Sequence, residues 1–216
     1  LAAGIGKADQ YRVFFPGLVE PKKIPKNAAR QQFEMEAGEI YVAYVGRMTA
    51  IKRPDRLLNT AAEIKARNLS VKFIVAGEGD LFEATKRDSE RRDLPMKFLG
   101  WRKDIGALFA ASDIAILTSD NEGIPLTLIQ AAMTGLPIVS TNVGSVRDVV
   151  INRETGILTS TDTKAFVQEV IALINNDEEW LRLGNSGKKH AETQFSLAGM
   201  IDAHAAMYSQ ILHTRN

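Results

Sequence analysis

The sequence predicts an α/β fold in which a mainly parallel sheet is covered by helices on both faces. Short apolar runs rich in β-branched residues alternate with longer amphipathic runs along most of the chain. Connections of that length require crossovers between parallel strands. The chain has 216 residues, of which 45% are hydrophobic and 25% are charged, and this composition suits a globular protein with a full core.

The predicted elements follow one another in a regular order. Strands are expected at residues 40–45, 71–76, 96–99, 113–118, 136–141 and 156–159. Helices are expected at residues 54–66, 81–91 and 105–111, and a further helix begins at Pro125. After the last strand the pattern is fully helical, with helices beginning at Thr163, Asp177 and Ser196.

The ends of the chain are expected to lie outside this sheet domain. Prolines and lysines interrupt residues 1–39, and a short strand is expected there only at residues 11–15. We interpret residues 1–39 as an interdomain connection and residues 40–194 as the main domain. Residues 195–216 form a C-terminal helix that packs on this domain or on another one. The chain starts at Leu1, not at a methionine, which suggests that a further segment precedes it.

Composition excludes several classes of function. Lys and Arg total 27 against 26 Asp and Glu, so no global field favours nucleic acid or a membrane surface. There is no cysteine, which excludes disulfides and fits a reducing, cytoplasmic location. No run is long and apolar enough to span a bilayer, although a longer protein containing this chain could associate peripherally with a membrane.

Residues 119–135, which read S-D-N-E-G-I-P-L-T-L-I-Q-A-A-M-T-G, form the first candidate site. They join two predicted strands, and ligands of parallel sheets bind beyond the carboxyl ends of the strands. Pro125 suits the first position of a helix, where its missing N–H has no cost. The amides of Leu126 and Thr127 would then point out of the helix start, with Glu122 just outside it. Free amides and the positive end of a helix dipole form an anion site.

Two cations flank the loop after the first strand. Gly46 and Arg47 end this strand, and Lys52 follows five residues later. An arginine can bind two phosphate oxygens at once, while a lysine supplies a point charge, so the two could neutralise a diphosphate without a metal. The alternative is that Arg47 pairs with a local carboxylate and that Lys52 is simply solvated.

Other motifs favour structural roles. The G-E-G sequence at residues 77–79 lacks the third glycine of a dinucleotide fingerprint, because Phe82 stands there, so a plain turn is favoured. Trp101 could stack on a base, but covering the sheet edge is the favoured interpretation. The three histidines all lie in the C-terminal helices, and no Asp-x-Asp pair or Walker A sequence is present. No metal site and no phosphate-loop hydrolysis are therefore expected.

Five sequence blocks form a more specific signal when they are taken together. They are V-G-R-x-x-x-x-K at 45–52, V-A-G-E-G at 75–79, F-L-G-W at 98–101, E-G-I-P-L-T-L-I-Q-A-A at 122–132 and S-T-N-V-G at 140–144. In order and spacing this set resembles the C-terminal half of retaining glycosyltransferases of family 4. The resemblance implies the GT-B architecture, two Rossmann-like domains of which the second binds a nucleotide sugar. An upstream acceptor-binding domain is then expected as a partner.

The resemblance also implies roles for individual residues. Arg47 and Lys52 would hold the departing nucleoside diphosphate, and Glu122 would hydrogen-bond the hydroxyls of the donor sugar. The remaining donor-binding residues would be Gly46, Gly100, Trp101, Gly123, Ile124, Pro125, Leu126, Thr127 and Gln130, with the base near Gly100 and Trp101. The sugar would pass from a nucleoside diphosphate donor to an acceptor, with its anomeric configuration kept and without metal or cofactor.

One position departs from the pattern of the family. Gln130 stands where relatives carry a glutamate that accepts hydrogen bonds from the ribose. A neutral acceptor binds less strongly than an ionised one, so donor affinity would fall roughly tenfold. Two hypotheses follow: the donor-binding domain of an enzyme, or a non-catalytic sugar-nucleotide-binding module that works with a separate acceptor-binding chain. A sugar-nucleotide epimerase of related architecture fits the sequence less well.

Overall fold

A computed structural model describes residues 11–213, within which six parallel strands form a single sheet. The strand order is β3-β2-β1-β4-β5-β6. The strands are β1 (Ile40–Val45), β2 (Val71–Ala76), β3 (Met96–Phe98), β4 (Ile114–Leu117), β5 (Ile138–Thr141) and β6 (Ile157–Thr159). This is the order of the Rossmann fold, and the predicted fold class is confirmed. The order reverses between β1 and β4, which is where ligands of such sheets bind.

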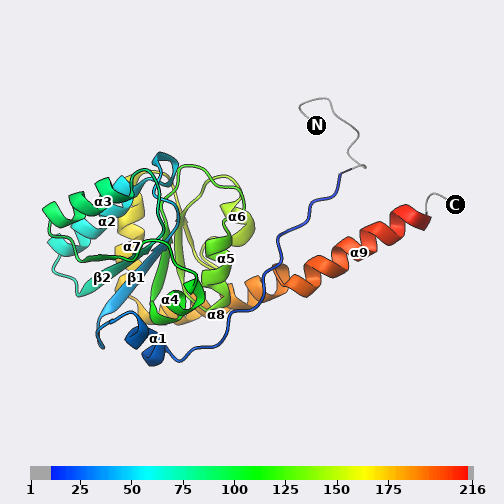
Figure 1. Cartoon of the computed structure of the whole chain (residues 1–216), viewed down its shortest axis with the longest axis horizontal. Coiled ribbons are helices and arrows are strands. Elements are labelled where there is room, and N and C mark those ends of the chain that lie inside the picture. The colour runs from blue at the N-terminus through cyan, green and yellow to red at the C-terminus, as the bar shows by residue number, and fades with distance from the viewer. Residues whose placement is uncertain (1–10, 214–216) are drawn as a thin grey trace.

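Helices cover both faces of the sheet (Figure 1). One face carries α1 (Lys26–Gln32), α4 (Ile105–Ala111), α5 (Leu126–Met133) and α6 (Val146–Val149). The other carries α2 (Pro54–Ala66), α3 (Phe82–Arg91) and α7 (Thr163–Ile174), while α8 (Asp177–Gln194) contacts both α5 and α7. The sheet separates two cores, because side chains alternate along each strand: Tyr41 and Ala43 face one core, and Val42 and Tyr44 face the other.

Most predicted elements agree with the structure. The bounds of β1, β2, α2 and α4 coincide with the predicted ranges. The predicted starts of α7 and α8 also coincide with the structure, and the other predicted strands of the sheet and helices differ at their ends by one or two residues, which is the usual uncertainty of such boundaries. Pro125 caps α5 and does not occupy its first helical position.

The predicted strand at residues 11–15 is wrong. Among the described residues this segment pairs with no strand, and it contacts α9 (Leu197–His213). Phe14 stacks on His204 with ring centroids 4.2 Å apart. Leu18 then exchanges backbone hydrogen bonds with Phe195 and Leu197, at 2.8 and 3.1 Å. The apolar run is therefore used to pack on a helix.

Two α-helices and a short 3-10 helix at Ala50–Lys52 were not predicted. Within residues 1–39 the structure contains α1, whose Ala29 is fully buried. Lys26 and Arg30 of α1 form ion pairs with Asp113, and the same carboxylate accepts a hydrogen bond from the Tyr41 amide at 2.7 Å. These contacts come from distant parts of the chain, so a local pattern does not indicate them. The second unpredicted α-helix, α6, is only four residues long.

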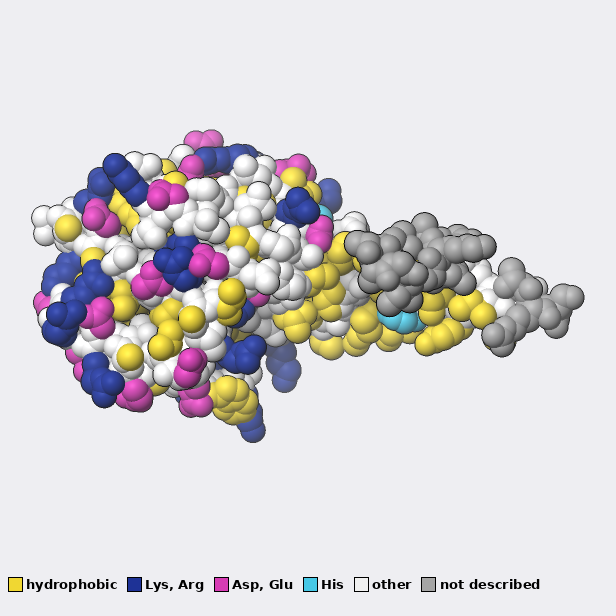
Figure 2. Space-filling view, turned by 90° about the horizontal axis from the view of Figure 1, so that it is seen from above, with side chains coloured by type: hydrophobic (Ala, Val, Ile, Leu, Met, Phe, Trp, Pro, Cys, Tyr) yellow, Lys and Arg dark blue, Asp and Glu magenta, His cyan; other side chains and the backbone are white. Residues whose placement is uncertain are grey.

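The last helix, α9, projects away from the sheet domain (Figure 1). None of its described residues is buried. Large apolar side chains lie along this projection (Figure 2), among them Ile201 at 54%, Tyr208 at 59% and Leu212 at 67% exposure. Within residues 11–213, no helix combines the length and apolar character needed to cross a membrane.

Candidate functional site

The predicted site residues follow strands that are neighbours in the sheet. Arg47 and Lys52 follow β1, Trp101 follows β3, and Glu122 follows β4. Because β1 pairs in parallel with both β2 and β4, the loops after these strands emerge at one edge. The structure thus brings together, around the switch point, residues that lie up to 75 positions apart in the sequence.

An ion pair at this edge joins Lys52 and Glu122. The Lys52 Nζ atom lies 2.5 Å from Glu122 Oε1, and the two side chains are 18% and 8% exposed. The Ser119 hydroxyl donates to the same carboxylate oxygen, also at 2.5 Å, and Ser119 is fully buried. The alternative that Lys52 is simply solvated is therefore wrong. A partly buried carboxylate with an ammonium beside it can accept hydroxyl hydrogen bonds from a polar ligand.

The charge of Glu122 in this pair affects the pKa of Tyr44. Its side chain is fully buried on β1. Burial raises the pKa of Tyr44 well above its ordinary value, and the negative charge of Glu122 raises it further. Both causes disfavour a phenolate, so Tyr44 remains a neutral hydrogen-bonding group below the carboxylate. Its hydroxyl donates to the backbone carbonyl of Arg47 at 3.4 Å.

Arg47 has a different setting from Lys52. Its side chain is exposed, and it forms no ion pair with any carboxylate in the described part of the chain. It lines a cavity of about 510 Å³. The other residues around this cavity are Val45, Gly46, Ala76, Gly77, Glu78, Gly79, Trp101, Arg102 and Ile105. An unpaired guanidinium at the rim of a mostly apolar cavity can bind an anion attached to an apolar ring.

Two glycines bring the loops after β1 and β2 into contact. A side-chain carbon at Gly77 would lie 2.0 Å from the carbonyl oxygen of Gly46, and one at Gly79 would lie 2.5 Å from that of Met48. Met48 also donates its amide to the Glu78 carbonyl at 2.9 Å. Residues 77–79 form an irregular loop and not the expected turn, which begins only at Asp80, and this loop forms one wall of the cavity.

Trp101 does not cover the sheet edge, so the favoured interpretation of this residue was wrong. Its side chain is 61% exposed and lines the same cavity as Arg47. The Lys103 ammonium lies 5.6 Å from the centre of its ring. Gly100 precedes it with a φ of 66°, which turns the chain so that the Trp101 amide donates to Glu78 Oε1 at 3.3 Å. An exposed indole on a cavity wall offers a stacking surface.

The start of α5 presents two amides to this edge. Pro125 is buried and caps the helix. The first amide to bond within the turn is that of Leu128, which donates to the Pro125 carbonyl at 3.0 Å. In the part of the chain that the structure describes, the amides of Leu126 and Thr127 donate to no protein acceptor. Two amides without a protein acceptor are what an anion site at this helix start requires, and the site itself stays a prediction.

The loop that leads to α5 is held by a glycine of the next loop. Gly144 has a φ of 52°, and a side-chain carbon there would lie 1.8 Å from the carbonyl oxygen of Glu122. Ser145 donates its amide to that oxygen at 3.3 Å. Gly123 is exposed and Ile124 is half-buried. The turn around Glu122 thus depends on contact with the loop after β5.

Among the predicted donor-binding residues, Gln130 lies furthest along α5 from its N-terminus. Its side chain is half-buried and makes no side-chain hydrogen bond within residues 11–213. It therefore keeps its amide oxygen available as an acceptor.

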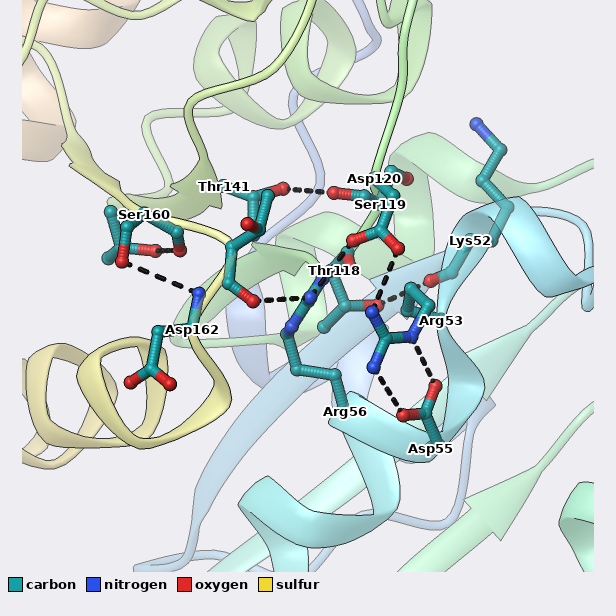
Figure 3. Close-up of polar contacts among 12 residues, drawn as sticks. Lys52, Arg53, Asp55, Arg56, Thr118, Ser119, Asp120, Thr141, Ser160 and Asp162 are labelled. Carbon is teal, nitrogen blue, oxygen red and sulfur yellow. Dashed lines mark hydrogen bonds and ion pairs between the residues drawn. The ribbon is translucent and has the colours of Figure 1, made fainter.

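Four polar residues near the site were missed in the sequence. Asp120 lies between Arg53 and Arg56, with N–O distances of 2.8 and 2.9 Å (Figure 3). Ser119 donates to the Glu122 carboxylate. The available signal was weak: Arg53 and Arg56 follow Lys52 closely, and Ser119 and Asp120 precede Glu122. Spacing alone does not show that these two loops meet.

Comparison with known proteins identifies the family. Residues 25–190, more than half of the chain, match the family described as glycosyl transferases group 1. This chain belongs to that family. It is 28% identical over 196 residues to D-inositol 3-phosphate glycosyltransferase of Segniliparus rotundus, a match that covers 87% of this chain and 43% of the relative. The glycosyl transferase group 1 chain thus spans less than half the length of this curated relative.

Two solved structures resemble this glycosyl transferase group 1 domain. The HepE protein of Anabaena in complex with UDP and glucose superposes with a TM-score of 0.86 at 22% identity, covering 96% of this chain and 59% of that one. The C-terminal domain of a group 1 family protein, LpcC of Francisella tularensis, has a TM-score of 0.71 at 16% identity. That match covers 82% of this chain and 95% of the other. The chain therefore has a Rossmann-like α/β fold that matches GT-B glycosyltransferase structures.

Proposed function

We propose that this chain is the donor-binding domain of a retaining, metal-independent glycosyltransferase of family 4, which moves a hexose from a nucleoside diphosphate to an acceptor. The contact between Lys52 and Glu122 carries the proposal. It joins a cation and a carboxylate from two loops at the switch point, beside the free amides of α5. A nucleotide sugar offers hydroxyls to a carboxylate and a diphosphate to cations and amides.

Arg47 and Lys52 form the diphosphate clamp in this proposal. Negative charge develops on the leaving diphosphate as the bond to the sugar breaks, and fixed cations stabilise that charge. Arg47 is exposed and without an ion pair in the described residues, so it can bind phosphate oxygens without first losing a partner. Lys52 is held by Glu122, so it must share its protons between the carboxylate and the diphosphate. The Leu126 and Thr127 amides complete the anion site.

Glu122 binds the donor sugar in this proposal, and the cavity beside Trp101 receives the base. The Glu122 carboxylate is 8% exposed, so hydrogen bonds to sugar hydroxyls form in a partly dry setting. The Trp101 indole offers a face on which a base can stack. Fittingly, the Anabaena HepE structure, which shares the fold, is a complex with UDP and glucose.

An upstream domain supplies the acceptor site in this proposal. The chain covers 43% of the length of its Segniliparus rotundus relative, which leaves room for a domain of similar size. The exposed apolar side chains of α9, including Ile201 and Tyr208, are the surface we assign to it. The absence of cysteine fits a cytoplasmic protein. If no upstream half accompanies this chain, the second candidate, a sugar-nucleotide-binding module paired with a separate chain, is favoured by the neutral Gln130.

Calorimetric titration with UDP, GDP and ADP tests the donor site. We expect one of the three to bind, and Arg47→Ala and Lys52→Ala should each weaken that binding roughly ten- to a hundredfold. This is the effect of losing a hydrogen bond to a charged group, about 1.5 to 3 kcal/mol. The corresponding nucleoside should lose much less. Lys72→Ala is the matched control, because Lys72 pairs with Glu36, away from this edge.

Two results would contradict the proposal. One is the absence of binding by any of the three nucleoside diphosphates at millimolar concentration. The other is an equal loss of affinity for nucleoside and nucleoside diphosphate, which would mean that the two cations do not contact phosphate.

A further inference from the structure

A fully buried arginine lies beneath the candidate site. Arg56 of α2 is 0% exposed. Its guanidinium donates to the carbonyl of Thr118, to the carboxylate of Asp120 at 2.9 Å and to the carbonyl of Thr161 at 2.5 Å (Figure 3). Thr118 and Asp120 follow β4, Thr161 follows β6, and α2 itself follows β1. One side chain therefore connects three loops at the ligand-binding edge.

This arginine is a costly way to stabilise a fold. Burying a charge has a large desolvation cost, and replacing buried ion pairs by apolar residues is often neutral or stabilising. In addition, the Arg56 Nε atom is buried and has no hydrogen-bond partner among residues 11–213. An orphaned buried donor is a further cost. Stability alone does not account for such a residue.

Asp120 extends the connection to a second arginine. Arg53 binds the other carboxylate oxygen of Asp120 at 2.8 Å, and the Asp120 amide donates to the carbonyl of Ile51 at 2.8 Å. Burial acts to raise the pKa of Asp120, but the hydrogen bonds from Arg53 and Arg56 outweigh it and hold that pKa below its ordinary value. We call Arg53, Arg56 and Asp120 the arginine clasp.

The arginine clasp surrounds the residues that place Lys52 and Glu122. On one side, the Thr118 hydroxyl donates to the carbonyl of Lys52 at 2.7 Å. On the other, Ser119, between Thr118 and Asp120, bonds the Glu122 carboxylate. The chain before and after Lys52 is thus fixed to the segment that leads into Glu122. A shift in this segment would change the spacing of the cation and the carboxylate together.

We propose that Arg56 is a positioning residue that acts through Asp120 to hold Lys52 and Glu122 at the spacing that the donor requires. The part of the proposal that concerns the donor rests on the proposed function. The part that concerns the spacing of Lys52 and Glu122 does not need a ligand. The two parts are therefore tested separately.

The first test measures the acetylation rate of Lys52 by acetic anhydride, followed by mass spectrometry. In the unmodified chain Lys52 is shielded by its contact with Glu122. We expect Asp120→Asn and Arg56→Lys to make Lys52 react severalfold faster, towards the rate in Glu122→Gln. Asp120 is chosen because its side chain is 34% exposed, so the substitution spares the core.

Asp113→Asn is the matched control. Asp113 also pairs with two cations, Lys26 and Arg30, but it stands at the opposite end of β4. This variant should lose stability and leave the Lys52 rate unchanged. An unchanged Lys52 rate in Asp120→Asn, or the same increase in Asp113→Asn, would overturn the proposal.

The second test measures nucleoside diphosphate affinity in a double-mutant cycle. Asp120→Asn should weaken binding of the diphosphate about tenfold, as expected for a displaced charged hydrogen bond. In a Lys52→Ala background the same substitution should have little effect, because the group that it positions is gone. Additive losses would mean that the arginine clasp acts independently of Lys52, which contradicts the proposal. If no nucleoside diphosphate binds the unmodified chain, the proposed function fails while the acetylation rates still decide the spacing.

Discussion

At the scale of single residues, Gln130 is the position where the chain departs from the family pattern, and it bears on the strength of the proposed donor binding. Its half-buried side chain has an amide oxygen that bonds no group in the described part of the chain; this oxygen can accept a hydrogen bond from a hydroxyl but carries no charge. Hydrogen bonds to charged groups stabilise by about 1.5 to 3 kcal/mol, against about 0.5 to 1.5 for neutral ones. The chain is therefore expected to bind its donor more weakly than a relative with glutamate at this position.

If the proposed donor site is right, Gln130→Glu should raise affinity for the preferred nucleoside diphosphate about tenfold, because an ionised acceptor would then face the ribose hydroxyls. Calorimetric titration measures the change. The dideoxynucleoside diphosphate is the control ligand, since it lacks those hydroxyls and should gain nothing. A gain of the same size for both ligands would place the new charge away from the ribose, and a loss for the natural ligand would indicate a site adapted to the neutral amide.

At the scale of elements, the site depends on loops that touch through glycines. Gly144 is the sharpest case, because its φ is 52° and any side-chain carbon would lie 1.8 Å from the Glu122 carbonyl oxygen. Gly144→Ala must move the loop after β5 away from the turn that carries Glu122. Strain of this kind costs on the order of 1 to 3 kcal/mol of unfolding free energy.

We therefore expect Gly144→Ala to lower the free energy of unfolding by about that amount and to weaken nucleoside diphosphate binding in the remaining folded protein. Urea denaturation and calorimetry measure the two effects. Gly38→Ala is the matched control, because it adds backbone strain without a steric clash. Gly38 has a φ of 86°, but no described atom lies within 4 Å of an added side-chain carbon. Retention of full affinity by Gly144→Ala would show that the turn around Glu122 does not depend on this loop.

Elements that follow local patterns were predictable, and those that depend on distant contacts were not. β1 and β2 are short, mainly apolar runs, and this length indicates buried strands. α2 carries an apolar stripe at helical spacing, which indicates a helix. By contrast, α1 is held by ion pairs to Asp113, which comes more than 80 residues later. The apolar run at residues 11–15 has no strand beside it and packs along α9.

The same distinction applies to the site. The sequence indicates the residue types and their loops, because Arg47, Lys52 and Glu122 each follow a predicted strand. It does not indicate that Lys52 and Glu122 touch, nor that Arg56 reaches beneath both loops, because these contacts span more than 60 residues. Their geometry depends on the order of strands in the sheet, which a single sequence leaves open.

At the scale of the whole molecule, the chain consists of a packed sheet domain and a projecting helix (Figure 1). The two meet at Phe195, which is fully buried at the end of α8 and contacts the Phe15 and His190 rings. Beyond it, α9 has no buried residue among those described. The stability of the isolated chain should therefore depend on Phe195 and depend little on the apolar side chains further along α9.

Replacing Ile201 and Tyr208 together with serine should leave the unfolding temperature of the isolated chain nearly unchanged, because both side chains are more than half exposed. Phe195→Ala should instead cost about 3 to 5 kcal/mol, the usual effect of emptying a buried aromatic position. Differential scanning calorimetry compares the two. In sedimentation experiments the double serine variant should also self-associate less, since exposed apolar patches promote association. A large fall in its unfolding temperature would mean that these α9 side chains pack on this domain. They would then not be the surface that contacts the acceptor-binding half.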